Sequence, residues 1–126
     1  MNKRLEIYKN FIDGLVKIRK CMLVNRIMER GWPKLPENDK INNLLSELTS
    51  EQKIILSEIV QNARDGGIHD VLAYLNDEIN LKGLSITKYG VDIAIEPFGT
   101  QLNYDWVCRR EGDEWPENQL ENEYLD

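Results

Sequence analysis

The chain has 126 residues, of which 41% are hydrophobic and 30% charged, and its formal net charge is −6. These values predict one globular domain over residues 1–126. No stretch of the sequence approaches the roughly 20 consecutive apolar residues of a membrane span, so we expect none. Charges interrupt the first 20 positions, which excludes a secretory signal. Cys21 and Cys108 are too few to staple the domain, so we expect buried or half-buried thiols in a cytoplasmic protein.

Charge is unevenly distributed along the chain. Residues 1–34 carry nine basic and three acidic side chains, a net charge of +6, whereas residues 35–126 carry seven basic and 19 acidic ones, a net charge of −12. A basic segment of this kind binds nucleic acid or membranes in some proteins. Because an acidic chain is repelled by phosphate backbones, we favour a basic segment that lies across the acidic remainder of its own domain.

The first predicted helix is unusually long. Apolar residues recur at steps of three or four from Leu5 to Ile27, which predicts a helix over residues 3–30. Gly31 and Pro33 are expected to end it. At ~1.5 Å per residue this helix would be roughly 40 Å long, so we expect one end to project or to pair with another subunit.

Three shorter helices are predicted after the first one, over residues 39–47, 50–64 and 67–80. Thr49 and Gln52 have the spacing of a capping box, in which each side chain binds the backbone N–H of the other residue. Gly66 and Gly67 are expected to separate the last two helices, because glycine disfavours helix interiors.

After Gly83 the period of the apolar residues changes from about 3.6 to 2. Residues 84–88 and 91–96 are predicted to form a hairpin about a turn at Tyr89–Gly90, and "YDWVCRR", residues 104–110, a third strand. The predicted fold is therefore α+β, with N-terminal helices packed on a small three-stranded antiparallel sheet. Residues 111–126 form an acidic C-terminal tail with seven carboxylates and no basic residue.

His69 is the single histidine of the chain and has several acids near it in the sequence. On a wheel of the predicted helix, His69 and Asn76 lie at the border of the apolar arc. Asp70 and Asp77 point toward solvent, so the acids do not surround the imidazole in space. The pattern therefore predicts no metal site. We favour a hydrogen-bonded histidine at a helix start over a general base.

The predicted third strand supplies further candidate residues. A strand that ends with Arg109 and Arg110 could bind a carboxylate or a phosphate, but the simpler interpretation is that both arginines pair with the acids that follow them. No catalytic residue, metal or cofactor is predicted. The candidate ligand-binding residues are His69, Asn76, Asp105, Trp106 and Arg109.

Two segments of the chain, "ARDGGIHDVLAYLNDEIN" and "YDWVCRREGDEWPE", resemble a family of small bacterial proteins of unknown function. The resemblance covers about residues 50–117. It implies a cytoplasmic bacterial protein, and it transfers no catalytic residue to this chain.

The long helix, the acidic surface and two tryptophans that precede prolines favour a non-enzymatic protein-interaction module. Such a module binds a protein partner or self-associates, as acidic inhibitor and immunity proteins bind basic partners. Trp32 and Trp115 are expected to anchor loops or interfaces. The alternative is a small enzyme or ligand-binding protein with a cleft near His69, Trp106 and Arg109. No membrane partner is expected, and nucleic acid is disfavoured because no aromatic platform accompanies the basic residues.

Overall fold

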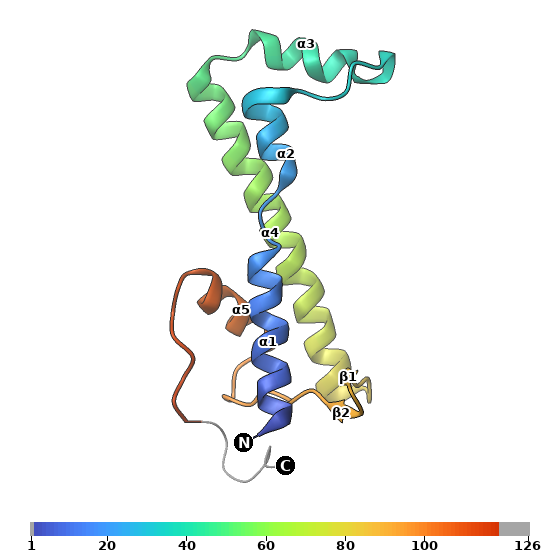
Figure 1. Ribbon diagram of the computed structural model, residues 1–126, viewed down its shortest axis with the longest axis vertical. Helices are drawn as coiled ribbons and strands as arrows, with labels where there is room; N and C mark the ends of the chain where they lie inside the picture. Colours follow the sequence, from blue (N-terminus) through green and yellow to red (C-terminus); the bar gives the residue numbers. More distant parts are fainter. Residues whose placement is uncertain (1, 119–126) are drawn as a thin grey trace. The chain divides into compact units, whose positions relative to one another are not determined.

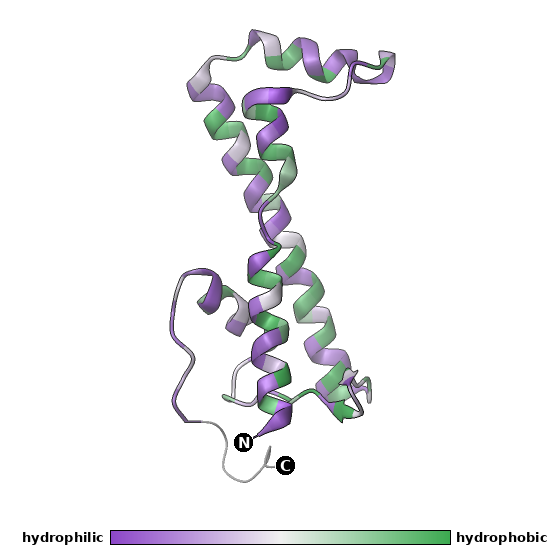
Figure 2. Ribbon diagram, viewed as in Figure 1, coloured by the Kyte–Doolittle hydropathy of each residue, from purple (hydrophilic) through white to green (hydrophobic). Residues whose placement is uncertain are grey.

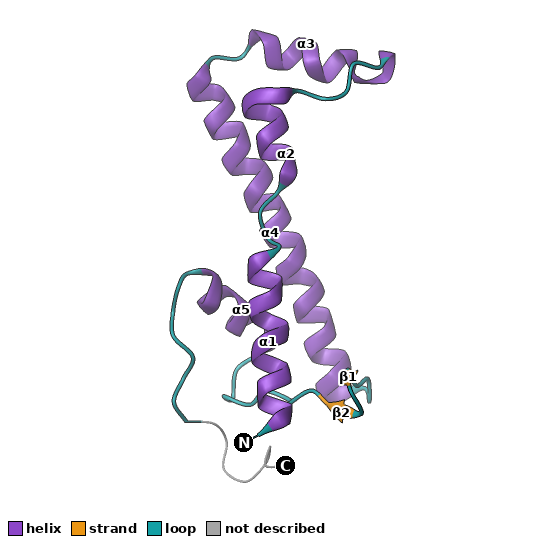
Figure 3. Cartoon of the chain, in the orientation of Figure 1, coloured by secondary structure: helices purple, strands orange, loops and turns teal. Residues whose placement is uncertain are grey.

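The computed structural model describes residues 2–118 (Figure 1). This part of the chain is mostly helical, with one short hairpin (Figure 3). Its elements are α1 (Lys3–Lys17), α2 (Met22–Asn25), the π-helical turn η1 (Arg26–Arg30), the 3-10 turn η2 (Pro36–Asn38), α3 (Asp39–Glu47), α4 (Ser50–Leu81), β1 (Thr87–Lys88), β2 (Val91–Asp92) and α5 (Leu102–Arg110). Of the predicted acidic tail, residues 119–126 lie outside the described residues.

The chain divides into two compact units. Unit 2 is Arg19–Gly67, and unit 1 comprises the described residues up to Ile18 together with those from Ile68 onward. The division falls inside α4, so each half of this helix belongs to a different unit.

The long first helix predicted from the sequence is interrupted. α1 ends at Lys17, and helical structure resumes at Met22. Past the end of α1, the side chain of Gln61 on α4 holds the backbone: its amide nitrogen donates to the carbonyl of Arg19 at 3.0 Å, and its oxygen accepts from the N–H of Cys21 at 2.9 Å. Backbone groups that a continuous helix would pair internally are therefore satisfied by a residue about 40 positions away, which periodicity does not register.

The helix over residues 39–47 is confirmed as α3, and α4 begins as predicted. The N–H of Thr49 donates to Oε1 of Gln52 at 2.9 Å, and the N–H of Gln52 donates to Oγ1 of Thr49 at 3.2 Å. This is the reciprocal geometry of a capping box, so it satisfies two N–H groups that the start of a helix leaves unpaired.

The predicted separation at Gly66 and Gly67 is wrong, because α4 is one helix from Ser50 to Leu81. A glycine in a helix costs about 1 kcal/mol relative to alanine. This cost is too small to interrupt α4, because the helix has buried residues on both sides of the two glycines, with Asp65 before them and Leu72 after them.

Part of the predicted sheet forms. β1 and β2 pair antiparallel, with Thr87 opposite Asp92 and Lys88 opposite Val91. The turn lies at Tyr89–Gly90 as predicted, with φ of 52° and 77°, and two consecutive left-handed residues are typical of a type I′ hairpin. The strands are shorter than predicted, with two residues each.

The third strand predicted over residues 104–110 is wrong, because this segment lies in α5. Leu102, Asp105 and Trp106 are buried, and their spacing of three and four residues is that of one helix face. The two-residue alternation of "YDWVCRR" is too short to distinguish a strand from such a helix. The sheet therefore has two strands in the described part of the chain, and the fold is a helical one with a small hairpin.

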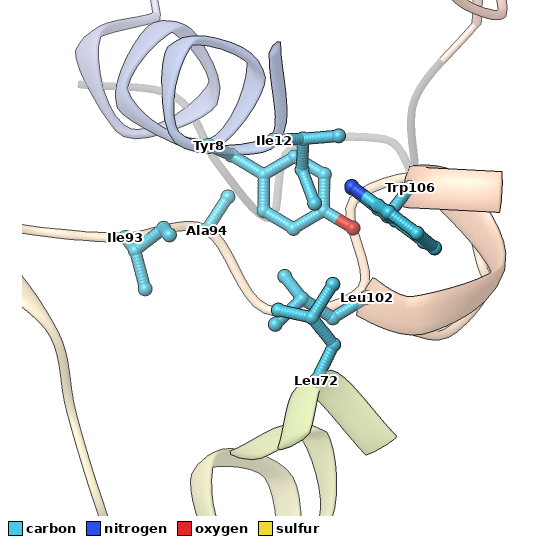
Figure 4. Close-up of a cluster of buried hydrophobic side chains, with 7 residues drawn as sticks. All are labelled: Tyr8, Ile12, Leu72, Ile93, Ala94, Leu102 and Trp106. Atoms are coloured by element: carbon cyan, nitrogen blue, oxygen red, sulfur yellow. The ribbon is translucent and has the colours of Figure 1, made fainter. Parts of the chain in front are cut away.

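The described residues of unit 1 form a hydrophobic core (Figure 4). It is formed by α1, the second half of α4, the segment after β2, and α5. In Figure 4 the rings of Tyr8 and Trp106 lie close together, with Leu72 and Leu102 on the opposite side of the tyrosine from α1. The buried members of this core are Tyr8, Ile12, Leu72, Ile93, Ala94, Leu102 and Trp106.

Candidate functional site

The five candidate ligand-binding residues all lie in unit 1. His69 and Asn76 lie on α4, whereas Asp105, Trp106 and Arg109 lie on α5. Each has described neighbours that define what it does in the fold, and two of the five border one pocket.

His69 lies in the middle of α4 rather than at a helix start. Its side chain is 43% exposed, as expected for a residue at the edge of the core. Its Nε2 lies 3.4 Å from Nδ2 of Asn103, and its Nδ1 lies 3.4 Å from Oδ1 of Asp70, which is otherwise exposed. Among the described residues, no group of three His, Cys, Asp or Glu could hold a metal ion.

Asn76 joins three elements of unit 1. Its Oδ1 accepts from the N–H of Leu102 at 2.9 Å, which satisfies the first N–H of α5. Its Nδ2 donates to Oε2 of Glu96 at 3.0 Å, and Asn80, one turn later, donates to the same oxygen. The φ of Glu96 is 41°, a left-handed conformation that non-glycine residues rarely adopt. The two asparagines therefore hold a strained backbone in place through its side chain.

Asp105 is a buried acid, with 5% of its surface exposed. The hydroxyl of Tyr8 donates to one carboxylate oxygen and the hydroxyl of Thr100 to the other. Burial raises the pKa of Asp105 above its ordinary value, the two hydroxyl donors oppose this shift, and the negative charge of Glu96 adds to it. The two groups that donate hydrogen bonds to Asp105 are thus uncharged hydroxyls.

Trp106 belongs to the core and has no exposed surface. Its indole N–H has no partner among the described residues. The guanidinium of Arg110 lies 5.2 Å from the centre of its ring and pairs with Glu111 at 2.6 Å, as the sequence predicted for that arginine. Because Trp106 is enclosed by the core, it packs the fold and presents no face to a ligand.

Arg109 reaches across to α1. Its Nε and Nη2 donate to the two carboxylate oxygens of Asp13 at 2.8 and 3.2 Å, and its Nη1 donates to the carbonyl of Asp113 at 2.8 Å. The indole of Trp115 lies 4.8 Å from the guanidinium carbon and donates to Asp13 at 3.3 Å. The arginine, its acid and the tryptophan thus form one cluster, which holds the loop after α5.

Asp105 and Arg109 border a pocket of about 330 Å³ that is lined by α5 and by the loops before and after it. The pocket is also lined by Phe98, Tyr104, Cys108 and Trp115, whereas His69, Asn76 and Trp106 do not line it. The rings of Phe98 and Trp115 stack at 5.6 Å, which confirms Trp115 as a loop anchor. Sequence reasoning missed Asp13 and Thr100, since neither lies in a pattern that marks a site.

A second candidate surface lies on α3, in unit 2. Ile41, Leu44, Leu45 and Leu48 recur at the spacing of one helix face, which we call the α3 face. Of these residues Leu45 is buried, whereas Ile41 is 38% and Leu44 53% exposed. Figure 2 shows hydrophobic segments recurring along α3. An amphipathic helix normally buries its apolar face, so this one lacks a full covering in the described chain.

The first half of α4 carries another uncovered surface. Gln52, Ile55, Ile59, Asn62 and Gly66 are all exposed and recur at steps of three and four, and we call them the α4 stripe. Ile55 is 57% and Ile59 59% exposed. None of the five residues is charged. Their spacing is that of the contact positions of a coiled coil, in which a second helix covers such a stripe.

The structure thus defines a mostly helical protein. Two of the candidate residues border a pocket in unit 1, and unit 2 has uncovered apolar helix faces. The chain belongs to a family of unknown function, DUF6547, which matches residues 1–117. The resemblance predicted from two segments is confirmed and extends further toward the N-terminus. Searches of the curated proteins and of the solved structures returned no match. In the described residues, no helix combines the length and apolar character that crossing a membrane requires.

Proposed function

We propose that this protein is an interaction module that self-associates, and that a second copy of the chain covers the apolar surface of unit 2. The observation that carries this proposal is the imbalance between buried and exposed side chains in that unit. Its described buried hydrophobic residues are Cys21, Ile27 and Leu45. Its exposed large hydrophobic residues are Met22, Leu23, Leu35, Ile41, Leu44, Ile54, Ile55 and Ile59.

This imbalance is costly in water. Burying apolar surface stabilises a protein by about 25 cal/mol per Å², and monomeric proteins rarely expose large contiguous apolar patches. The α3 face and the α4 stripe each gather their residues on one side of a helix. Covering either of them in a complex would recover free energy that folding of the unit alone leaves unused.

Charge favours a second copy of the chain over a basic partner. Unit 2 carries eight basic and seven acidic side chains, a net charge of +1, whereas the remainder of the chain carries eight basic and 15 acidic ones, a net charge of −7. Two copies that meet through unit 2 face almost no net repulsion, whereas two copies that meet through the acidic remainder repel each other. An acidic inhibitor would present its acidic surface, and the uncovered surface is the near-neutral one.

The α4 stripe also suits pairing with itself. Most soluble oligomers are symmetric, so the same patch on both copies forms the contact. A stripe of Ile55 and Ile59 between uncharged residues lets two α4 helices approach without burying an unpaired charge. The α3 face would add to the contact area needed for a stable interface, roughly 1,200–2,000 Å² in total.

The test is sedimentation velocity over a range of concentrations. We expect the wild-type chain to dimerise and the variant with Ile55→Lys and Ile59→Lys to remain monomeric. Lysine keeps helix propensity but places two charges in the contact. Val71→Lys is the matched control, because Val71 is 59% exposed on α4 but lies outside the stripe. Circular dichroism verifies that both variants keep their helices.

Two results would contradict the proposal. One is a wild-type chain that stays monomeric at all concentrations. The other is a stripe variant that dimerises as tightly as the Val71→Lys control.

A further inference from the structure

Among the described residues, the buried carboxyl group of Asp105 has no cationic partner. It receives hydrogen bonds from the hydroxyls of Tyr8 and Thr100, and within residues 2–118 no basic side chain forms an ion pair with it. Arg109, one helical turn further along α5, is taken up by Asp13 and by the carbonyl of Asp113. Buried charges in proteins are normally paired, because burial without a partner is expensive. A carboxylate accepts about four hydrogen bonds, so two hydroxyl donors leave capacity for another donor.

Asp105 is one of the residues that line the pocket of about 330 Å³ beside α5. This volume lies at the lower end of the roughly 300–1,000 Å³ of ligand sites. The charged residues that line it are the acids Asp105, Asp113 and Glu114 and one base, Arg109. Since Asp13 already neutralises the arginine, the pocket has an excess of negative charge and disfavours anions.

Half of the uncharged residues that line the pocket are aromatic. Phe98, Tyr104 and Trp115 line it, and the rings of Phe98 and Trp115 are stacked. The negative faces of these rings attract cations, and the ammonium of Lys9 lies 5.9 Å from the centre of the Phe98 ring and 5.8 Å from that of the Trp115 ring. The rings also cover apolar chains. Acids beside aromatic rings form an environment that suits an ammonium group attached to a short apolar chain.

We infer that this pocket binds a small organic cation, a primary ammonium group on an apolar chain, and that Asp105 is its counter-ion. The ammonium donates to the carboxylate oxygens of Asp105 at the sites that Tyr8 and Thr100 leave open. The apolar chain lies against Phe98 and Trp115. This site belongs to unit 1, so it is independent of the self-association proposed for unit 2.

The test compares three probes that have a butyl chain: n-butylammonium chloride, n-butanol and sodium pentanoate. They differ in the charge of the head group and are titrated at neutral pH into the ¹⁵N-labelled full chain. The indole N–H of Trp115 and the amide of Cys108 report binding by NMR. We expect saturable shifts with butylammonium, an affinity at least about tenfold higher than that for butanol, and no saturable shift with pentanoate.

Asp105→Asn is the decisive variant, because it keeps the shape and an acceptor oxygen but removes the charge. It is expected to weaken butylammonium binding about tenfold and to leave butanol binding unchanged. Asp92→Asn is the control, since Asp92 is an exposed acid that does not line the pocket. The double change Asp113→Asn and Glu114→Gln, at exposed lining positions, is expected to weaken binding by a smaller factor.

The inference is overturned if butylammonium binds the wild-type chain no more tightly than butanol. It is equally overturned if Asp105→Asn binds butylammonium as tightly as the wild type does. If Asp105→Asn does not fold, the comparison of the three probes on the wild type decides the matter alone.

Discussion

Removing the carboxylate of Asp13 tests whether it holds the loop after α5 against α1. In Asp13→Ala, three hydrogen bonds are lost, two from the guanidinium of Arg109 and one from the indole of Trp115. A fully buried hydrogen bond to a charged group contributes about 1.5–3 kcal/mol. The side chains of Asp13 and Arg109 are 32% and 27% exposed, so solvent lowers the contribution of each of the three bonds well below this range, and the expected loss is the sum of three weakened bonds.

We therefore expect a loss of about 2 kcal/mol in the free energy of unfolding for Asp13→Ala. At a denaturant slope of about 2 kcal/mol per molar urea, this lowers the unfolding midpoint by about 1 M. The assay is urea unfolding followed by circular dichroism. Asp77→Ala is the matched control, because Asp77 is an exposed acid on α4, and it should change the stability by at most about 0.5 kcal/mol.

A double-mutant cycle with Arg109→Ala separates the pair from general effects of either substitution. Groups in direct contact show coupling of about 0.5–3 kcal/mol, and we expect a value above about 1 kcal/mol here. The reasoning is refuted if Asp13→Ala unfolds at the same urea concentration as Asp77→Ala. It is also refuted if the cycle yields no coupling, since the ion pair would then contribute nothing to the fold.

Two further predictions concern Asp105 and the glycines of α4. Burial raises the pKa of Asp105 in the folded state above the ordinary 3.8. The protonated carboxyl group therefore contributes its full stability below pH 3.8, and this contribution is lost as the pH rises through the folded pKa. Urea unfolding at several pH values should thus show the wild type losing stability relative to Asp105→Asn as the pH rises, and a gain would contradict this. Gly67→Ala should stabilise the chain by about 1 kcal/mol in thermal unfolding, since nothing lies within 4 Å of the added methyl group; a loss would mean that the helix does not continue there.

Local signals in the sequence predicted local structure well. The capping pair of Thr49 and Gln52, the helix over residues 39–47 and the turn at Tyr89–Gly90 all depend on neighbours within a few residues. The break after α1 could not be predicted in the same way, because it is held by Gln61, about 40 positions away. Apolar spacing continues through the break, so the period alone indicates a helix where none forms.

The candidate site was predictable in its residue types but not in its geometry. Asp105 and Arg109 were singled out on a predicted strand, and the structure places them one turn apart on a helix that borders a pocket. The acid that pairs with Arg109, Asp13, lies 96 residues away in the sequence. The partners of Asp105 on α1 and in the preceding loop likewise depend on the tertiary fold, so no spacing in the sequence could reveal them.

The conformation of Glu96 limits which residues can occupy that position. Glycine would relax the left-handed backbone but would leave the amides of Asn76 and Asn80 without their shared acceptor. Alanine would lose that acceptor and keep the strain. A library of all substitutions at this position, selected for folded protein, should therefore return mainly short polar side chains that accept hydrogen bonds and tolerate positive φ, which are aspartate and asparagine.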